Sequence, residues 1–157
     1  MSGYQGPSGV GQIAIPVTDL ERAVIFYRDV LGLHFLFRAP PGLAFLQCGE
    51  VRLMLGQRSP GAEEAKVGVV YYRVPDLDVA YATLRDRGAR FVDEPHRIAR
   101  LGDHELWMVF LRDPDEHLLA LMAERPLGGN PETKRVFQLL ASGRSVVLPK
   151  QQALPIA

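Results

Sequence analysis

The chain has 157 residues with a 47% hydrophobic composition, which is enough to bury one core, and its length suggests a single domain. Its formal net charge is zero and no basic stripe stands out, which argues against a nucleic-acid partner, and no apolar run approaches the roughly 20 residues that span a bilayer. Cys48, the single cysteine, excludes an intramolecular disulfide framework and, with an N-terminal stretch that lacks the features of a signal peptide, leads us to expect a cytoplasmic protein.

The first part of the chain predicts a strand, a helix and three further strands. Asp19 follows an apolar run at 12–17 and is a predicted helix N-cap, and Gly32 is predicted to end the helix because glycine adopts a left-handed conformation at little cost. The three strands are predicted at 33–38, 43–48 and 51–55. The apolar face of the helix, at helical spacing, is predicted to consist of Leu20, Ala23, Val24, Tyr27 and Leu31.

The second part, after a polar linker at 56–68, predicts the same order of elements. A strand at 69–74 precedes Asp76, the predicted N-cap of a helix with its own apolar face. Strands are predicted at 89–93, 104–112 and 117–123, with a turn at 113–116. The residues at 94–103, which include His96, Arg97 and Arg100, are predicted to form a long loop of a kind that is often functional.

The two parts also share a sequence repeat at a fixed offset. Six residues of the first part recur 57 positions later, which indicates two similar supersecondary units. The pairs are Val17 and Val74, Asp19 and Asp76, Leu20 and Leu77, Ala23 and Ala80, Arg28 and Arg85, and Asp29 and Asp86.

Three motifs extend this pattern: IAIPVTDL at 13–20, FYRDVLGL at 26–33 and FLRDPD at 110–115. Together they resemble the vicinal oxygen chelate superfamily, which contains glyoxalases, bleomycin resistance proteins and extradiol dioxygenases. The resemblance implies an α+β fold in which two tandem βαβββ modules, 10–57 and 67–124, curl into a half-barrel cup within one domain at 10–124. It also implies a homodimer whose second subunit helps to complete the site.

Enzymes of this superfamily typically hold a divalent metal inside the cup through His, Gln and Glu side chains. The resemblance places the four ligand positions at Gln12, Met54, Val69 and Ala120. Thioether and hydrocarbon side chains cannot replace hard or borderline ligands, and one amide oxygen binds a divalent ion poorly, so we expect no metal cofactor.

Strand alternation extends these positions to a predicted cup lining. The lining is mostly apolar with a few polar groups, a composition typical of a small-molecule pocket. We therefore expect a small, largely apolar or aromatic ligand that carries one polar or anionic group. The residues predicted to contact it are Gln12, Arg52, Met54, Tyr71, His104, Met108, Phe110 and Ala120.

Some of these residues have competing interpretations. His104 is the candidate catalytic residue because imidazole suits acid–base chemistry near neutral pH, but a surface or interface role fits equally well. Gln12 has a structural alternative, a hydrogen bond to a neighbouring strand end, and the methionines could be core filler. His96 and His104, with acidic neighbours, offer an unconventional metal site whose spacing matches no established pattern. His117 is expected to be a solvated turn residue.

The C-terminal extension, 125–157, lies outside the resemblance. Asn130 and Pro131 predict a helix start and Gly143 a helix end, with an apolar stripe between them. We expect this helix to pack on the dimer partner or to cover the mouth of the cup.

Three functions remain open at this point. The first is a metal-free protein that binds a small molecule, as bleomycin resistance proteins do. The second is a glyoxalase-like lyase or dioxygenase-type enzyme with a relocated metal, or with metal-free chemistry on His104, Tyr71 or Arg100. The third is an interaction module that retains the fold alone.

Overall fold

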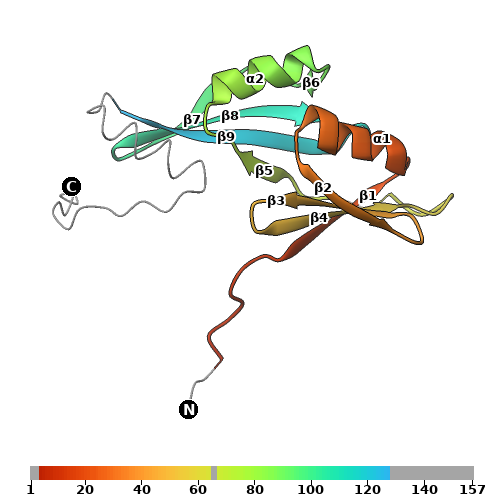
Figure 1. The fold of residues 1–157 in the computed structure, drawn as a ribbon. Helices are drawn as coiled ribbons and strands as arrows, with labels where there is room; N and C mark the ends of the chain where they lie inside the picture. Colours follow the sequence, from red (N-terminus) through yellow and green to blue (C-terminus); the bar gives the residue numbers. More distant parts are fainter. Residues whose placement is uncertain (1–3, 65–66, 128–157) are drawn as a thin grey trace.

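The structure, a computed structural model, describes residues 4–64 and 67–127 and forms two β-sheets, each with one helical segment packed on it (Figure 1). The helix predicted near 130–143 lies outside the described residues. The first sheet has the strand order β1-β4-β3-β2, with β1 and β4 parallel. Its elements are β1 (Gln12–Val17), α1 (Leu20–Ile25), the π-helical turn η1 (Phe26–Val30), β2 (His34–Ala39), β3 (Leu43–Cys48) and β4 (Val51–Gln57).

The second sheet repeats this topology and has the strand order β5-β9-β8-β6. Its first strand again lies parallel to its last, because β5 pairs with β9 as β1 pairs with β4. The two tandem βαβββ units predicted from the 57-residue repeat are therefore present. The elements are β5 (Val70–Arg73), α2 (Leu77–Asp86), β6 (Arg90–Phe91), β7 (His96–Leu101), β8 (His104–Arg112) and β9 (Leu118–Pro126).

Both helices begin and end where the sequence predicts. The carboxylate of Asp19 accepts a hydrogen bond of 3.1 Å from the backbone N–H of Arg22, and Asp76 accepts one of the same length from Val79. These contacts satisfy N–H groups that lack a partner inside the helix. Gly32 and Gly88 follow the helices with φ values of +90° and +88°, a region that residues with a Cβ rarely adopt.

The prediction of a loop at 94–103 is wrong, because most of this segment is β7. β7 pairs antiparallel with one half of β8, and the short β6 pairs with the other half, so the two together form one interrupted edge strand. The alternation of apolar and polar residues that marks a half-buried strand is missing here, since five of the six residues of β7 are exposed. Backbone pairing with β8 fixes this strand, and its sequence gives little sign of it.

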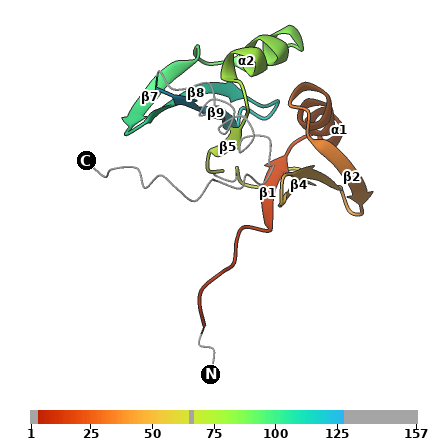
Figure 2. The ribbon, with the colours of Figure 1, turned by 60° about the vertical axis from the view of Figure 1, so that its left-hand side comes forward.

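A single apolar core lies between the helices and the sheets, as Figures 1 and 2 show by placing α1 and α2 on the same side of the sheets. The modules are joined at this side: the buried hydroxyl of Tyr27 donates to Asp113 at 2.8 Å, and Thr18 donates to Asp115. His117 also contacts Asp113 at 2.8 Å and keeps only 17% of its side chain exposed. The expectation of a solvated His117 is therefore wrong. Among the described residues, no helix has the length and apolar character needed to cross a membrane.

Candidate ligand-binding face

The faces of the two sheets that point away from the helices carry the residues that the sequence marks as a cup lining. We call these two faces together the cup face. On β4, Leu53 and Leu55 point into the core, whereas Arg52 is exposed and Met54 half-buried on the opposite side. On β5, Tyr72 is buried among core residues and Tyr71 is 48% exposed. Alternation along each strand thus separates core from cup face.

On the first sheet, Arg52 is the centre of a polar and aromatic cluster. Its Nε donates a hydrogen bond of 2.8 Å to the side-chain oxygen of Gln12, its partner in the β1–β4 register. Its guanidinium lies 5.5 Å from the centre of the Phe45 ring, a cation–π distance. The Gln12 amide nitrogen in turn lies 3.7 Å from the sulfur of Met54. These contacts fix the position of an exposed guanidinium.

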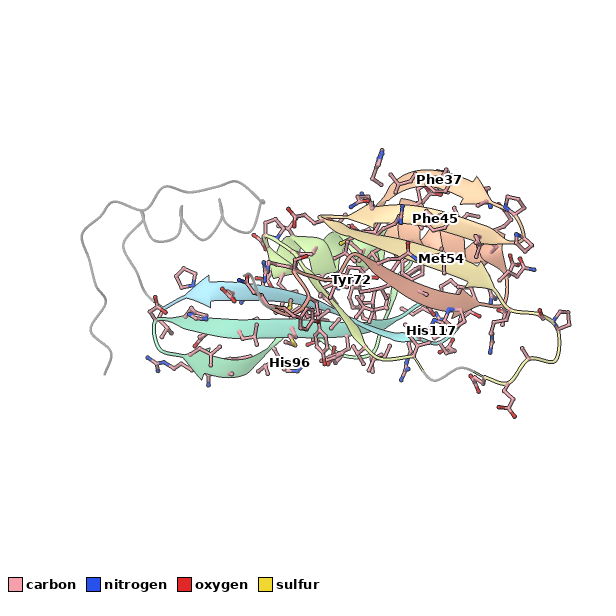
Figure 3. The ribbon with its side chains drawn as sticks, turned by 90° about the horizontal axis from the view of Figure 1, so that it is seen from below. Phe37, Phe45, Met54, Tyr72, His96 and His117 are labelled. Carbon is pink, nitrogen blue, oxygen red and sulfur yellow. The ribbon has the colours of Figure 1, made fainter. Side chains whose placement is uncertain are left out.

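Two aromatic rings that the sequence did not single out complete this part of the face. Phe37 and Phe45 stack with ring centres 4.6 Å apart, and Phe37 remains 46% exposed. Figure 3 shows Phe37, Phe45 and Met54 in a row across neighbouring strands. The alternation in β3 could have identified Phe45, because it shares a face with Met54. None of the four positions that match metal ligands lies on β3.

On the second sheet, Phe110 brings together residues from three strands. Its ring centre lies 6.3 Å from that of Tyr71 and 6.4 Å from that of His96. Ala120 pairs with both Tyr71 and Phe110 and is fully buried between them. The predicted residue Met108 lies on the same side, paired with Met122 of β9.

A hollow of about 400 Å³ lies between the first strands of the two modules. It is lined by Ile13, Ala14 and Pro16 of β1 and by the residues at 67–70 that lead into β5. It therefore brings Ala14 together with Val69, one of the four positions that match metal ligands. Apolar atoms of this kind favour an apolar part of a small molecule.

His104, by contrast, is distant from Tyr71 and Phe110. It lies at the start of β8, six positions before Phe110, and pairs with Pro126 and Leu101. At the rise of an antiparallel strand, six residues span roughly 20 Å. Its Nδ1 lies 2.9 Å from a carboxylate oxygen of Asp103. The structure thus pairs His104 with a carboxylate but does not bring it to the aromatic cluster of the same chain.

The four positions that match metal ligands do not fit a divalent ion. Met54, Val69 and Ala120 offer no hard donor, and the only amide oxygen, that of Gln12, already accepts a hydrogen bond from a guanidinium. A fixed positive charge at this distance opposes a second cation. Over 4–64 and 67–127, no group of three or more His, Cys, Asp or Glu side chains is arranged as a metal site, and His96 and His104 are not part of such a group.

Buried titratable groups lie on the core side rather than on the cup face. Burial raises the pKa of the Tyr72 phenol well above its ordinary range, with smaller contributions from Cys48 and Asp113. Burial also raises the pKa of the half-buried Cys48 thiol. At neutral pH, Cys48 is therefore a thiol rather than a thiolate nucleophile.

Comparison with known proteins identifies the family. A family model described as "Glyoxalase/Bleomycin resistance protein/Dioxygenase superfamily" matches residues 9–121. The chain belongs to this superfamily. The crystal structure of a lactoylglutathione lyase from Agrobacterium tumefaciens has 25% sequence identity and a TM-score of 0.58, with 74% of this chain and 94% of that chain covered.

Two further proteins are similar to this chain. A superfamily protein from Alicyclobacillus acidocaldarius superposes with a TM-score of 0.59 at 25% identity, with coverage of 76% of this chain and 93% of its own. The uncharacterized protein YraH of Bacillus subtilis is 28% identical, over 70% of this chain and 94% of YraH. Superfamily membership establishes the fold and the class of protein, and the side chains of the cup face must supply the argument for function.

Proposed function

We propose that this protein binds a small, largely aromatic molecule with one anionic group on its cup face, without the metal of its enzymatic relatives. The observation that carries the proposal is the placement of Arg52. Its guanidinium is held by Gln12 and Phe45, is exposed, and forms no ion pair with a carboxylate in the described ranges. A fixed and unneutralised guanidinium favours a carboxylate or phosphate group in a ligand.

The aromatic residues of the cup face support the aromatic part of the proposed ligand. Phe37 on the first sheet and Tyr71 on the second expose ring surface on the cup face, and each packs against a second ring, Phe45 and Phe110 respectively. Rings of this kind contribute large contact areas at a small cost in side-chain entropy. A ligand with a ring and a carboxylate would use both the rings and Arg52.

We also propose that a second copy of the chain covers the cup face, as the family resemblance implies. The support is the exposure of Tyr71 and Phe37, two large aromatic side chains on the same face of a folded chain. Large exposed apolar side chains that share a face fit an interface or a ligand site. Sedimentation velocity at micromolar concentration should show a dimer, and Phe37→Asp should shift it toward the monomer.

The binding experiment compares three probes of matched shape: benzoate, benzyl alcohol and benzylammonium. We expect benzoate to produce saturable shifts of backbone amide resonances in β4 and β9, benzyl alcohol to bind at least about tenfold more weakly, and benzylammonium not to bind. Equal affinity for all three probes would show that Arg52 plays no part in recognition. Turnover of a thioester or catechol substrate by the metal-free protein would instead favour the enzymatic alternative.

A further inference from the structure

A second hollow lies on the opposite side of the molecule from the cup face, where the two modules meet. Its volume is about 370 Å³. Figures 1 and 2 both place the C-terminal end of α2 beside α1 at this junction, and Arg87 after α2 donates to the carbonyl of Val30 at 3.2 Å. The lining residues are Arg22, Phe26, Gly88, Ala89, Arg90, Arg112, Pro114 and Glu116.

Three of these residues are arginines from three different elements. Arg22 comes from α1, Arg90 from β6 and Arg112 from β8. Arg90 forms an ion pair with the Glu116 carboxylate, but neither Arg22 nor Arg112 has a carboxylate partner among the described residues. Glu116 is the single acidic residue of the lining. The lining therefore has a net charge of about +2, counted as three guanidinium groups and one carboxylate.

Glu116 holds two of the three guanidinium groups. Its carboxylate accepts from Nη1 of Arg90 at 2.5 Å, and its backbone carbonyl accepts from Nη1 of Arg112 at 2.9 Å. Arg90 also donates to the carbonyl of Asp113 at 2.7 Å. The two guanidinium groups are thus fixed before any ligand arrives, which lowers the entropic cost of binding.

The backbone of Glu116 is strained in the conformation in which it contacts Arg90 and Arg112. Its φ is +65°, and it is the only residue other than glycine with a positive φ in the described ranges. A residue with a Cβ in this conformation costs on the order of 1 kcal/mol, and strain of this kind is found at ligand sites and switches. A glycine here would avoid the strain but would lose the carboxylate that holds Arg90.

We propose that this hollow binds a phosphate group, free or carried by a small molecule. A phosphate monoester has a charge between about −1.5 and −2 at neutral pH, which matches the net charge of the lining. Guanidinium groups bind phosphate oxygens through forked pairs of hydrogen bonds, and the lining offers three such groups from separate elements. The site is separate from the cup face, so a negative result at one site does not contradict the proposal for the other.

The test is a titration of the full chain with glycerol phosphate and, separately, with inorganic phosphate, followed by amide resonances. We expect saturable shifts at Gly88 and Ala89 and none at Met54. Arg22→Gln should weaken binding about tenfold, since it removes one charge-assisted contact from an exposed helix position. The matched control is Arg28→Gln, which removes an exposed arginine that pairs with Asp29 outside the hollow and should leave the affinity unchanged.

Three results would overturn the proposal: no saturable shift with either probe, equal affinity in the Arg22→Gln variant, or shifts confined to the cup face. Binding of both probes would assign the site to the phosphate group wherever it occurs. Binding of inorganic phosphate alone would assign it to the free ion. Sulfate, which keeps its double charge between pH 5 and pH 7.5, should bind equally at these two pH values, whereas glycerol phosphate should bind more weakly at pH 5.

Discussion

Arg52 of β4 donates a hydrogen bond of 2.8 Å to the side chain of Gln12 on β1, so a fixed cation lies beside the one residue that could have remained a metal ligand. In the metal-dependent members of the superfamily, as the resemblance implies, this part of the cup holds a divalent ion. The function proposed above assigns to the Arg52 guanidinium the attraction of an anionic group of a ligand. The difference leads to the first two predictions.

Replacement of Arg52 by glutamine should weaken the binding of benzoate at least about tenfold, because it removes the only positive charge of the Gln12–Phe45 cluster. Thermal stability should change little, since the side chain is exposed. Isothermal titration calorimetry measures the first effect and a melting curve the second. Arg38→Gln is the control: Arg38 pairs with Glu21 on the helix side of the sheet, and its loss should leave benzoate affinity intact.

Removal of metal should have no effect on ligand binding. We expect protein treated with EDTA and then dialysed to bind benzoate with unchanged affinity and to melt at an unchanged temperature. Elemental analysis of untreated protein should find far less than one zinc, nickel, manganese or iron per chain. Near-stoichiometric metal, lost together with binding on chelation, would contradict the proposed function and not the phosphate site.

The contact between Tyr27 and Asp113 should contribute measurably to stability, because it joins the two modules inside the core. Burial raises the pKa of Tyr27 far above its ordinary range, so its hydroxyl remains a neutral donor. Tyr27→Phe should lower the free energy of unfolding by about 1–3 kcal/mol, as measured by urea denaturation. Tyr81→Phe should have little effect, since that ring packs against Phe91 near the surface. A loss of stability equal in both variants would assign the effect to tyrosine in general.

Stability should fall at alkaline pH. The folded-state pKa values of Tyr27, Tyr72 and Cys48 are all raised by burial, so the unfolded chain releases these protons at lower pH than the folded chain does. Their contribution is complete below the ordinary values, about 8.5 for cysteine and about 10 for tyrosine, and is lost as the pH rises toward the folded-state values. Urea denaturation between pH 7 and pH 11 measures the decline.

Tyr72→Phe provides the control for that decline. The hydroxyl of Tyr72 is buried with no hydrogen-bond partner in the described part of the chain, so its removal should raise stability at neutral pH by about 1 kcal/mol. The same variant should lose stability less steeply above pH 10. An alkaline slope unchanged from that of the parent chain would show that Tyr72 does not titrate as its burial predicts.

The sequence alone was sufficient for the features that depend on neighbouring residues. The 57-residue repeat, the caps at Asp19 and Asp76, and the turns at Gly32 and Gly88 predicted the strand and helix order of both modules, and the structure confirms it except for β7. Alternation within single strands also separated Met54 from Leu53 and Leu55, because a strand places successive side chains on opposite faces whatever its partners are.

Only the tertiary structure decided which distant residues meet. The polar sequence at 94–103 becomes β7 because β8 offers a free edge, and His104 is separated from Phe110 because one long strand carries both. The Arg52–Gln12 contact and the hollow formed by Arg22, Arg90 and Arg112 depend on strand register and on the packing of one module against the other. Both arise from contacts between residues about 20 to 90 positions apart, which local propensity does not encode.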